Sequence, residues 1–306
     1  SIIESISKFE FILYSENEYL RFPFYSPNDS DLDEQCSIES VGADKAWDFW
    51  NISAGIMPGN RNVLLASVDT GVDYTHPDLW KNVWINQGEI PFLMLEDNAL
   101  DTNNNGIVTS EEIVSYLNNN VGDLNNDGLV NLRDAVSNNS PFENSQDNDG
   151  NGFVDDLLGW DPSGTYGNDD NDPFPKDGVS VSGGWAHGTH IAGVLAATTN
   201  NNLGMASTAF NASLISVKAS RSSSNTDEPG ISDGYDGILY AAKAGYYADT
   251  FTIINNSWGG GGYSGSENAT INTAYNTYGA IVIAAAGNDD EYSAHYPASY
   301  TNCISV

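Results

Sequence analysis

The segment GGWAHGTHIAGVLAA, residues 183–197, holds two of the four histidines of the chain. His187 and His190 flank Gly188 and Thr189, and a run of small apolar residues follows that is typical of a tightly packed helix. Imidazole changes its charge near neutral pH, so it suits proton transfer. His187, at the start of this helix, is therefore a candidate general base. The alternative is a structural histidine.

A histidine base needs a carboxylate to hold its tautomer and a donor to stabilise an oxyanion. Asp69 follows the apolar run Val63–Val68, and Gly71 behind it permits a tight turn. Asn288 ends the apolar segment AIVIAAAGN, and its amide could donate to an oxyanion. Singly, such residues are more often caps, turn residues or structural residues. Together, in this order, they favour serine hydrolase chemistry.

The elements that would carry these residues alternate along the chain. Apolar segments typical of buried strands lie at 63–68, 212–220, 250–260 and 280–288, and helical patterns lie at 38–50, 191–197, 231–245 and 266–279. This alternation predicts an α/β fold with a doubly wound, mostly parallel sheet and helices on both faces. Functional residues gather at the carboxyl ends of such strands, where Asp69, 255–259 and Asn288 are expected to lie.

The charge of the chain limits its partners. Ten Lys and Arg residues against 42 Asp and Glu residues give a formal net charge of −32, which predicts no nucleic-acid partner and no anionic membrane partner. The excess acid fits a hydrated surface, divalent-cation binding, or both. We find no apolar run of membrane-spanning length and no visible signal peptide. Cys36 and Cys303 could pair in a secreted protein, but the sequence leaves that open.

Residues 97–160 form an insert rich in Asn, Asp and Gly, in which three loops follow the calcium-loop template with Gly at position 6. The third loop has Leu158 at position 12, so it needs a ligand from elsewhere or binds weakly. The alternative is that these loops are simple turns without a bound ion. If they bind Ca²⁺, the ion could stabilise the fold or act as a sensor, and we favour the stabilising role. The expected ligands are Asp101, Asn103, Asn105, Ile107, Thr109 and Glu112; Asp123, Asn125, Asp127, Leu129 and Asp134; and Asp147, Asp149, Asn151, Phe153 and Asp155.

Four motifs, VDTGVDYTHPDL, HGTHIAGVLAA, INNSWGG and AAAGN, resemble those of the subtilisin-like serine proteases, the subtilases. The resemblance covers residues 26–306 apart from the insert. Within the insert, the second loop resembles dockerin-type repeats, and the third loop resembles a segment that some subtilases carry before the histidine motif. It implies Asp69 as the triad carboxylate, His187 as the base and Asn288 as the oxyanion donor. It further implies His190 as a structural residue, Ser257, Trp258 and Gly259 as the substrate-binding strand, and Asp78 as a calcium ligand beside a loop at about 198–204.

The nucleophile of this family lies in a Gly-Thr-Ser-Met-Ala-like motif, which the 306 residues do not contain. We therefore expect an incomplete catalytic domain at 26–96 and 161–306 and a propeptide remnant at 1–25. The resemblance implies a secreted, calcium-stabilised endopeptidase with polypeptide substrates and its own propeptide as partners, inactive as this chain alone. The alternatives are a serine-less pseudoprotease and a calcium-dependent, dockerin-like binding module.

Overall fold

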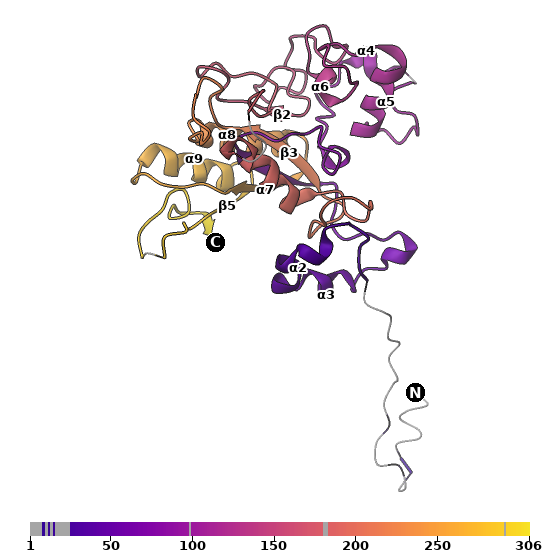
Figure 1. Ribbon diagram of the computed structural model, residues 1–306, viewed down its shortest axis with the longest axis vertical. Helices are drawn as coiled ribbons and strands as arrows, with labels where there is room; N and C mark the ends of the chain where they lie inside the picture. The colour runs from indigo at the N-terminus through magenta and orange to yellow at the C-terminus, as the bar shows by residue number, and fades with distance from the viewer. Residues whose placement is uncertain are drawn as a thin grey trace.

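The fold is that of a computed structural model, which describes residues 8, 9, 12, 15, 25–97, 99–179, 183–290 and 292–306. Most of the expected propeptide remnant at 1–25 lies outside the described residues. A central sheet and its helices occupy the middle of the molecule, with the insert on one side and the α2–α3 region on the other (Figure 1). The expected active-site residues all belong to the central part.

Six strands form one sheet in the order β2-β3-β1-β4-β5-β6, and every pairing in it is parallel. This arrangement confirms the predicted fold class. β2 was not predicted, because two residues are too few to show a periodic pattern. The strands are β1 (Val63–Asp69), β2 (Gly159–Trp160), β3 (Ser213–Lys218), β4 (Phe251–Asn256), β5 (Ile281–Ala284) and β6 (Cys303–Ser305).

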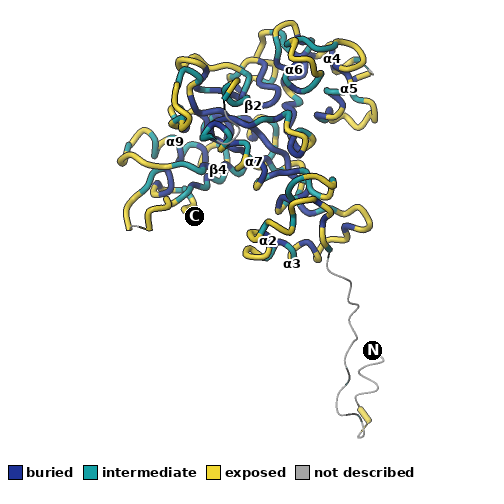
Figure 2. Tube along the Cα trace, viewed as in Figure 1, coloured by how far each residue is buried: buried dark blue, intermediate teal, exposed yellow. Residues whose placement is uncertain are grey.

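Alternate residues of the strands face helices on opposite sides of the sheet. Leu64, Ala66 and Val68 of β1 are fully buried in a cluster that includes residues of α8 (Gly234–Tyr247) and α9 (Gly265–Asn276). Leu65 points the other way and packs with residues of α7 (His187–Ala196). Figure 2 shows this centre as the most continuous buried region of the molecule. The sheet therefore holds the start of α7 against the end of β1.

A smaller region precedes β1 and consists of short helices. The single helix expected at 38–50 is in fact α2 (Cys36–Val41) and α3 (Ala43–Trp47), separated by Gly42 in a left-handed conformation with φ 71°. Because glycine adopts this conformation without strain, it ends α2 and lets the chain turn. Trp47 is buried there against Phe210. Two 3₁₀ turns, η1 (Leu32–Glu34) and η2 (Ile52–Ala54), complete this region.

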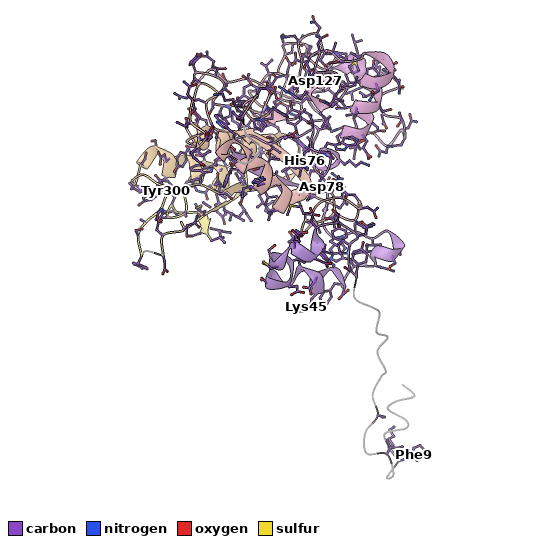
Figure 3. The ribbon with its side chains drawn as sticks, in the orientation of Figure 1. Phe9, Lys45, His76, Asp78, Asp127 and Tyr300 are labelled. Carbon is purple, nitrogen blue, oxygen red and sulfur yellow. The ribbon has the colours of Figure 1, made fainter. Side chains whose placement is uncertain are left out.

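The insert has its own apolar cluster, continuous with residues that follow β1. Ile113 and Leu117 of α5 (Ser110–Asn120) and Leu132 of α6 (Leu132–Ala135) are buried together with Tyr74 and Ile85. In Figure 3, Asp127 of the insert lies apart from His76 and Asp78, which are near α7. The remaining short helices are α4 (Phe92–Leu95), η3 (Trp80–Asn82) and η4 (Gly184–Ala186).

The sequence left open whether the two cysteines pair, and it contained no apolar run of membrane-spanning length. Cys36 and Cys303 are both free thiols, so they do not pair with one another here. Within the described ranges, no helix combines the length and the apolar character that crossing a bilayer requires.

Candidate active site and calcium loops

Asp69 and His187 meet where β1 ends and α7 begins. Nδ1 of His187 lies 2.8 Å from Oδ1 of Asp69, a carboxylate that is 1% exposed, while the His187 side chain is 45% exposed. The hydrogen bond to Asp69 raises the pKa of His187, although partial burial of the imidazole opposes the rise. A carboxylate can only accept, so Nδ1 carries the proton and Nε2 is left as the basic nitrogen.

Glycine permits this close approach of helix and strand. A Cβ atom at Gly188 would lie 2.3 Å from the carbonyl oxygen of Gly71 and 3.1 Å from Cβ of Asp69. The backbone N–H of Gly188 also donates to Oγ1 of Thr70 at 3.1 Å. No residue with a side chain fits at position 188 without moving α7 away from β1. Steric contact therefore explains why the HGTH motif has glycine at this position.

His190, expected to be a structural residue, is exposed and lies one turn along α7 from His187. It lines a cavity of about 370 Å³ together with His76, Asp73 and Phe174. Thr189 on the same turn accepts a hydrogen bond from the backbone N–H of Asp73 at 2.9 Å. The connection between this turn and the segment after β1 therefore comes from Thr189.

The segment Ser257–Gly259 follows β4, beside the end of β1 in the sheet. The indole N–H of Trp258 donates to the carbonyl oxygen of Val68 at 2.7 Å, and its ring leaves no room for a side chain at Gly234. Ser257 accepts a hydrogen bond from the amide of Asn255 at 2.9 Å. Trp258 thus ties the expected substrate strand to the residue that precedes Asp69.

Asn288 lies in the loop after β5, at the same carboxyl edge of the sheet as Asp69. Its side chain is exposed and makes no hydrogen bond to any other residue that the structure describes. The turn before it depends on Gly287, which has φ 108°. The amide is therefore free to meet a ligand at this edge.

Asp78 lies beside the expected loop at 198–204, together with a residue that we had not predicted. Asp78 is 3% exposed and accepts from the amide of Asn201 at 2.7 Å and the N–H of Met205 at 3.0 Å. Asp29 accepts from the N–H of Asn200 at 2.8 Å. Burial raises the pKa of both Asp78 and Asp29. The sequence around Asp29 has the composition of a linker, so it does not indicate that this residue contacts the loop at 198–204.

The three loops of the insert have one geometry. In each loop, the carboxylate at position 1 accepts from the N–H of the glycine at position 6, at 2.8 to 2.9 Å. The side chain at position 3 accepts from the N–H at position 5, and the side chain at position 5 accepts from the N–H at position 7. A carboxylate or amide oxygen has two lone pairs, so an oxygen that accepts one of these bonds can still bind a central cation.

The donor chemistry of the loops fits Ca²⁺. All the predicted ligands offer oxygen, which Ca²⁺ prefers. Oδ1 of Asp123, at position 1 of the second loop, is buried and has no hydrogen-bond partner among the described residues. A buried carboxylate oxygen without a partner is costly, and a bound cation would remove that cost.

Glu89 is a further acidic residue at the third loop, and we had not predicted it. One carboxylate oxygen each of Glu89, Asp147 and Asp149 lies within 4.8 Å of the other two. Glu89 is 1% exposed, and burial raises its pKa to about 7. It stands 58 residues before Asp147 in the sequence, in a segment without any calcium-loop pattern, so no local signal reveals it.

The sequence profile of the subtilase family (Peptidase S8) matches residues 60–306. The chain belongs to the subtilase family. This subtilase is 27% identical over 308 residues to a thermophilic serine proteinase of Bacillus sp. (strain AK1), a match that covers all of this chain and 51% of that protein. It is 40% identical over 138 residues to thermitase of Thermoactinomyces vulgaris, covering 45% of this chain and 44% of thermitase.

Halolysin of Haloferax mediterranei is a third relative of this subtilase, 29% identical over 306 residues, with 100% of this chain and 40% of halolysin covered. The chain thus spans about half the length of the relatives that match it throughout. Among solved structures, a protease from Pseudoalteromonas arctica PAMC 21717 superposes with a TM-score of 0.55 at 22% identity, covering 92% of this chain and 65% of that one. That likeness concerns the fold alone.

Proposed function

We propose that this subtilase carries the base and the carboxylate of a secreted serine endopeptidase, which hydrolyses peptide bonds in polypeptide substrates. The observation that carries the proposal is the 2.8 Å contact between Nδ1 of the half-exposed His187 and the buried Asp69. The family and the proteases among its relatives support it.

In the proposed reaction, Nε2 of His187 takes the proton of a serine hydroxyl as the oxygen attacks the peptide carbonyl. Asp69 keeps the imidazole oriented and stabilises the imidazolium that forms. His187 then gives the proton to the leaving amine, and water hydrolyses the acyl-enzyme by the same route in reverse. Asn288 and a backbone N–H hold the oxyanion.

Ser257, Trp258 and Gly259 are proposed to pair with the substrate backbone. The indole of Trp258 is held by the carbonyl of Val68, so this side chain would fix the position of the strand rather than move to fit each substrate. A strand anchored to the residue before Asp69 keeps the bound peptide in register with the base.

In this proposal the nucleophilic serine comes from residues other than these 306, which contain no Gly-Thr-Ser-Met-Ala-like motif. We expect the 306-residue chain to leave casein uncleaved and a longer product of the same reading frame that contains the motif to cleave it. In that product, His187→Ala should lower kcat by about 10⁶-fold, the loss that removal of the catalytic histidine causes in subtilisin. His190→Ala is the matched control with a much smaller loss.

A serine-less pseudoprotease that binds peptides along Ser257–Gly259 is the second candidate, and the absence of the motif from these residues favours it. Sequencing the reading frame downstream separates the two. A frame without a Gly-Thr-Ser motif in roughly the next hundred residues supports the pseudoprotease and contradicts the endopeptidase. A calcium-dependent binding module would instead require that the insert captures a partner only when calcium is present.

The insert at 97–160 is proposed to bind Ca²⁺ through its three loops, between the two catalytic-domain segments at 26–96 and 161–306. The unpartnered, buried Oδ1 of Asp123 and the shared loop geometry support this. Asp78 is proposed as a ligand of a separate site beside the loop at 198–204. When bound, Ca²⁺ supplies positive charge that offsets the repulsion between the carboxylates, and so it stabilises the fold.

A further inference from the structure

The third loop, Asp147–Leu158, has no acidic residue at its twelfth position. Leu158 occupies that position and is fully buried in the apolar cluster of the insert. A calcium loop of this kind is normally closed by a carboxylate at position 12 that binds the ion through both oxygens. The other two loops have such a residue, Glu112 and Asp134.

The first two loops show how this carboxylate is held. Glu112 accepts from the N–H groups at positions 2 and 9 of its loop, Thr102 and Thr109, both at 3.0 Å. Asp134 accepts from the N–H groups at the same two positions, Leu124 at 2.7 Å and Asn131 at 2.9 Å. In both loops, one carboxylate oxygen contacts position 2 and the other contacts position 9.

Glu89 makes the same contacts in the third loop. Its Oε1 accepts from the N–H of Asn148, position 2, at 2.8 Å, and from that of Asp149 at 3.1 Å. Its Oε2 accepts from the N–H of Asp155, position 9, at 3.1 Å. A residue outside the loop thus takes the place that Glu112 and Asp134 take from within their own loops.

The electrostatics of Glu89 call for a cation. Glu89 is 1% exposed, and no Lys or Arg side chain among the described residues pairs with it. Lys243, a basic group beside this loop, donates to the carbonyl oxygen of Asn151 and lies over the ring of Phe153 instead. Three carboxylates that converge within 4.8 Å without a counter-charge repel one another, and a divalent ion removes that repulsion.

We propose that Glu89 is the twelfth-position ligand of a calcium ion held by the third loop, with Asp147, Asp149 and Asn151 as side-chain ligands and Phe153 as the carbonyl ligand. The proposal rests on the calcium binding proposed above for the insert. It completes the loop that its own sequence leaves open.

This third site connects three parts of the chain. Asn86, three residues before Glu89, donates to Asp149 and to the fully buried Asp156, both at 3.0 Å. Asp156 in turn accepts from the hydroxyl of Tyr240 on α8 at 2.8 Å. The ion would therefore fasten the segment after β1, the third loop and α8 together. The first two sites draw all their predicted ligands from within the insert.

The test compares Glu89→Gln with Glu112→Gln, which removes the same charge from the first loop. Calcium bound per chain is counted by native mass spectrometry, affinity is measured by calorimetric titration, and thermal unfolding is followed by near-ultraviolet circular dichroism. We expect each variant to bind one ion fewer than the wild type. Glu89→Gln should also lower the unfolding temperature of the aromatic cluster of Phe153, Trp160 and Tyr240 by more than Glu112→Gln does, because only the third site is joined to α8.

A further variant, Glu89→Asp, guards against a failure of Glu89→Gln to fold. It keeps the charge but shortens the side chain, so we expect a folded protein with a calcium Kd at the third site raised about tenfold or more. Wild-type stoichiometry in Glu89→Gln, or an unchanged Kd in Glu89→Asp, would contradict the role of Glu89. A wild-type chain that binds no calcium at any loop would instead contradict the proposed function.

Discussion

At the scale of single residues, the site depends on the contact between His187 and Asp69. Asp69 is buried and has its Oδ1 shared between the imidazole and the N–H of Thr70 at 2.7 Å. Both donors stabilise the charged carboxylate, and that charge in turn favours the protonated imidazole. The pKa of His187 therefore reports whether the pair is intact.

Replacing Asp69 with Asn should lower the pKa of His187, because the hydrogen bond to Asp69 is the largest cause of its rise. A raised pKa means that the folded state binds this proton more tightly, so its stabilising effect is present below about pH 6.5 and disappears as the pH rises through the folded-state pKa. NMR titration of the ring checks the pKa. Urea unfolding of both proteins from pH 5 to 9 checks the linkage, and an identical pH dependence would contradict it.

The residues of this pair were predictable because each adjoins a strong local signal: Asp69 ends an apolar strand, and His187 begins a helix of small residues. Glu89 and Asp29 were not. Each acts through backbone N–H groups of a segment far away in the sequence, Asn148 for Glu89 and Asn200 for Asp29. Such contacts depend on tertiary folding and leave no periodic trace in one sequence.

At the scale of elements, the start of α7 approaches β1 so closely that only glycine fits at position 188. β1, β3, β4 and β5 were predictable from their apolar runs, whereas Gly42 broke the expected helix at 38–50 into α2 and α3. In that helix, the apolar pattern continued across a glycine whose left-handed conformation only the structure reveals.

Gly188→Ala should destabilise the chain by about 1–3 kcal/mol, because the added methyl group overlaps the Gly71 carbonyl oxygen and forces α7 outwards. The shift should also weaken the His187–Asp69 hydrogen bond and lower the pKa of His187. Denaturant unfolding and NMR measure the two effects. Val194→Ala on the exposed face of α7 is the control, expected to stay within about 0.5 kcal/mol. Equal stability of Gly188→Ala and wild type would contradict this prediction, because it would mean that α7 moves away from β1 without an energetic cost.

β3 offers a second test at this scale, since Lys218 is paired with Asp161 and both side chains are almost fully buried. Asp161→Asn should cost about 3–5 kcal/mol in the free energy of unfolding, because Lys218 is then left buried without its counter-charge. Glu111→Gln removes one carboxylate from the exposed pair with Lys81, and it should cost about 0–1 kcal/mol. Denaturant unfolding compares the two, and similar losses would contradict the dominance of burial.

At the scale of the whole molecule, a formal net charge of −32 opposes the compact state. Twelve of the 42 acidic residues lie in the insert at 97–160, where Asp147 and Asp149 of the third loop come together with Glu89. Composition predicted the excess of acidic residues, and the spacing of the calcium-loop motifs predicted that some of them lie close together in the insert. How the insert joins the core through Asp156 and Tyr240 required the structure.

Chelating calcium should therefore make stability strongly dependent on salt. In EDTA, raising NaCl from about 0.01 to 0.15 M shortens the Debye length from about 30 to 8 Å, so screening should raise the unfolding temperature markedly. With calcium saturating, the same salt step should have a smaller effect, because bound ions already offset much of the repulsion. Scanning calorimetry over the salt series measures both slopes, and KCl at equal ionic strength should match NaCl. Equal slopes with and without calcium would mean that the loops do not bind the ion in the folded chain.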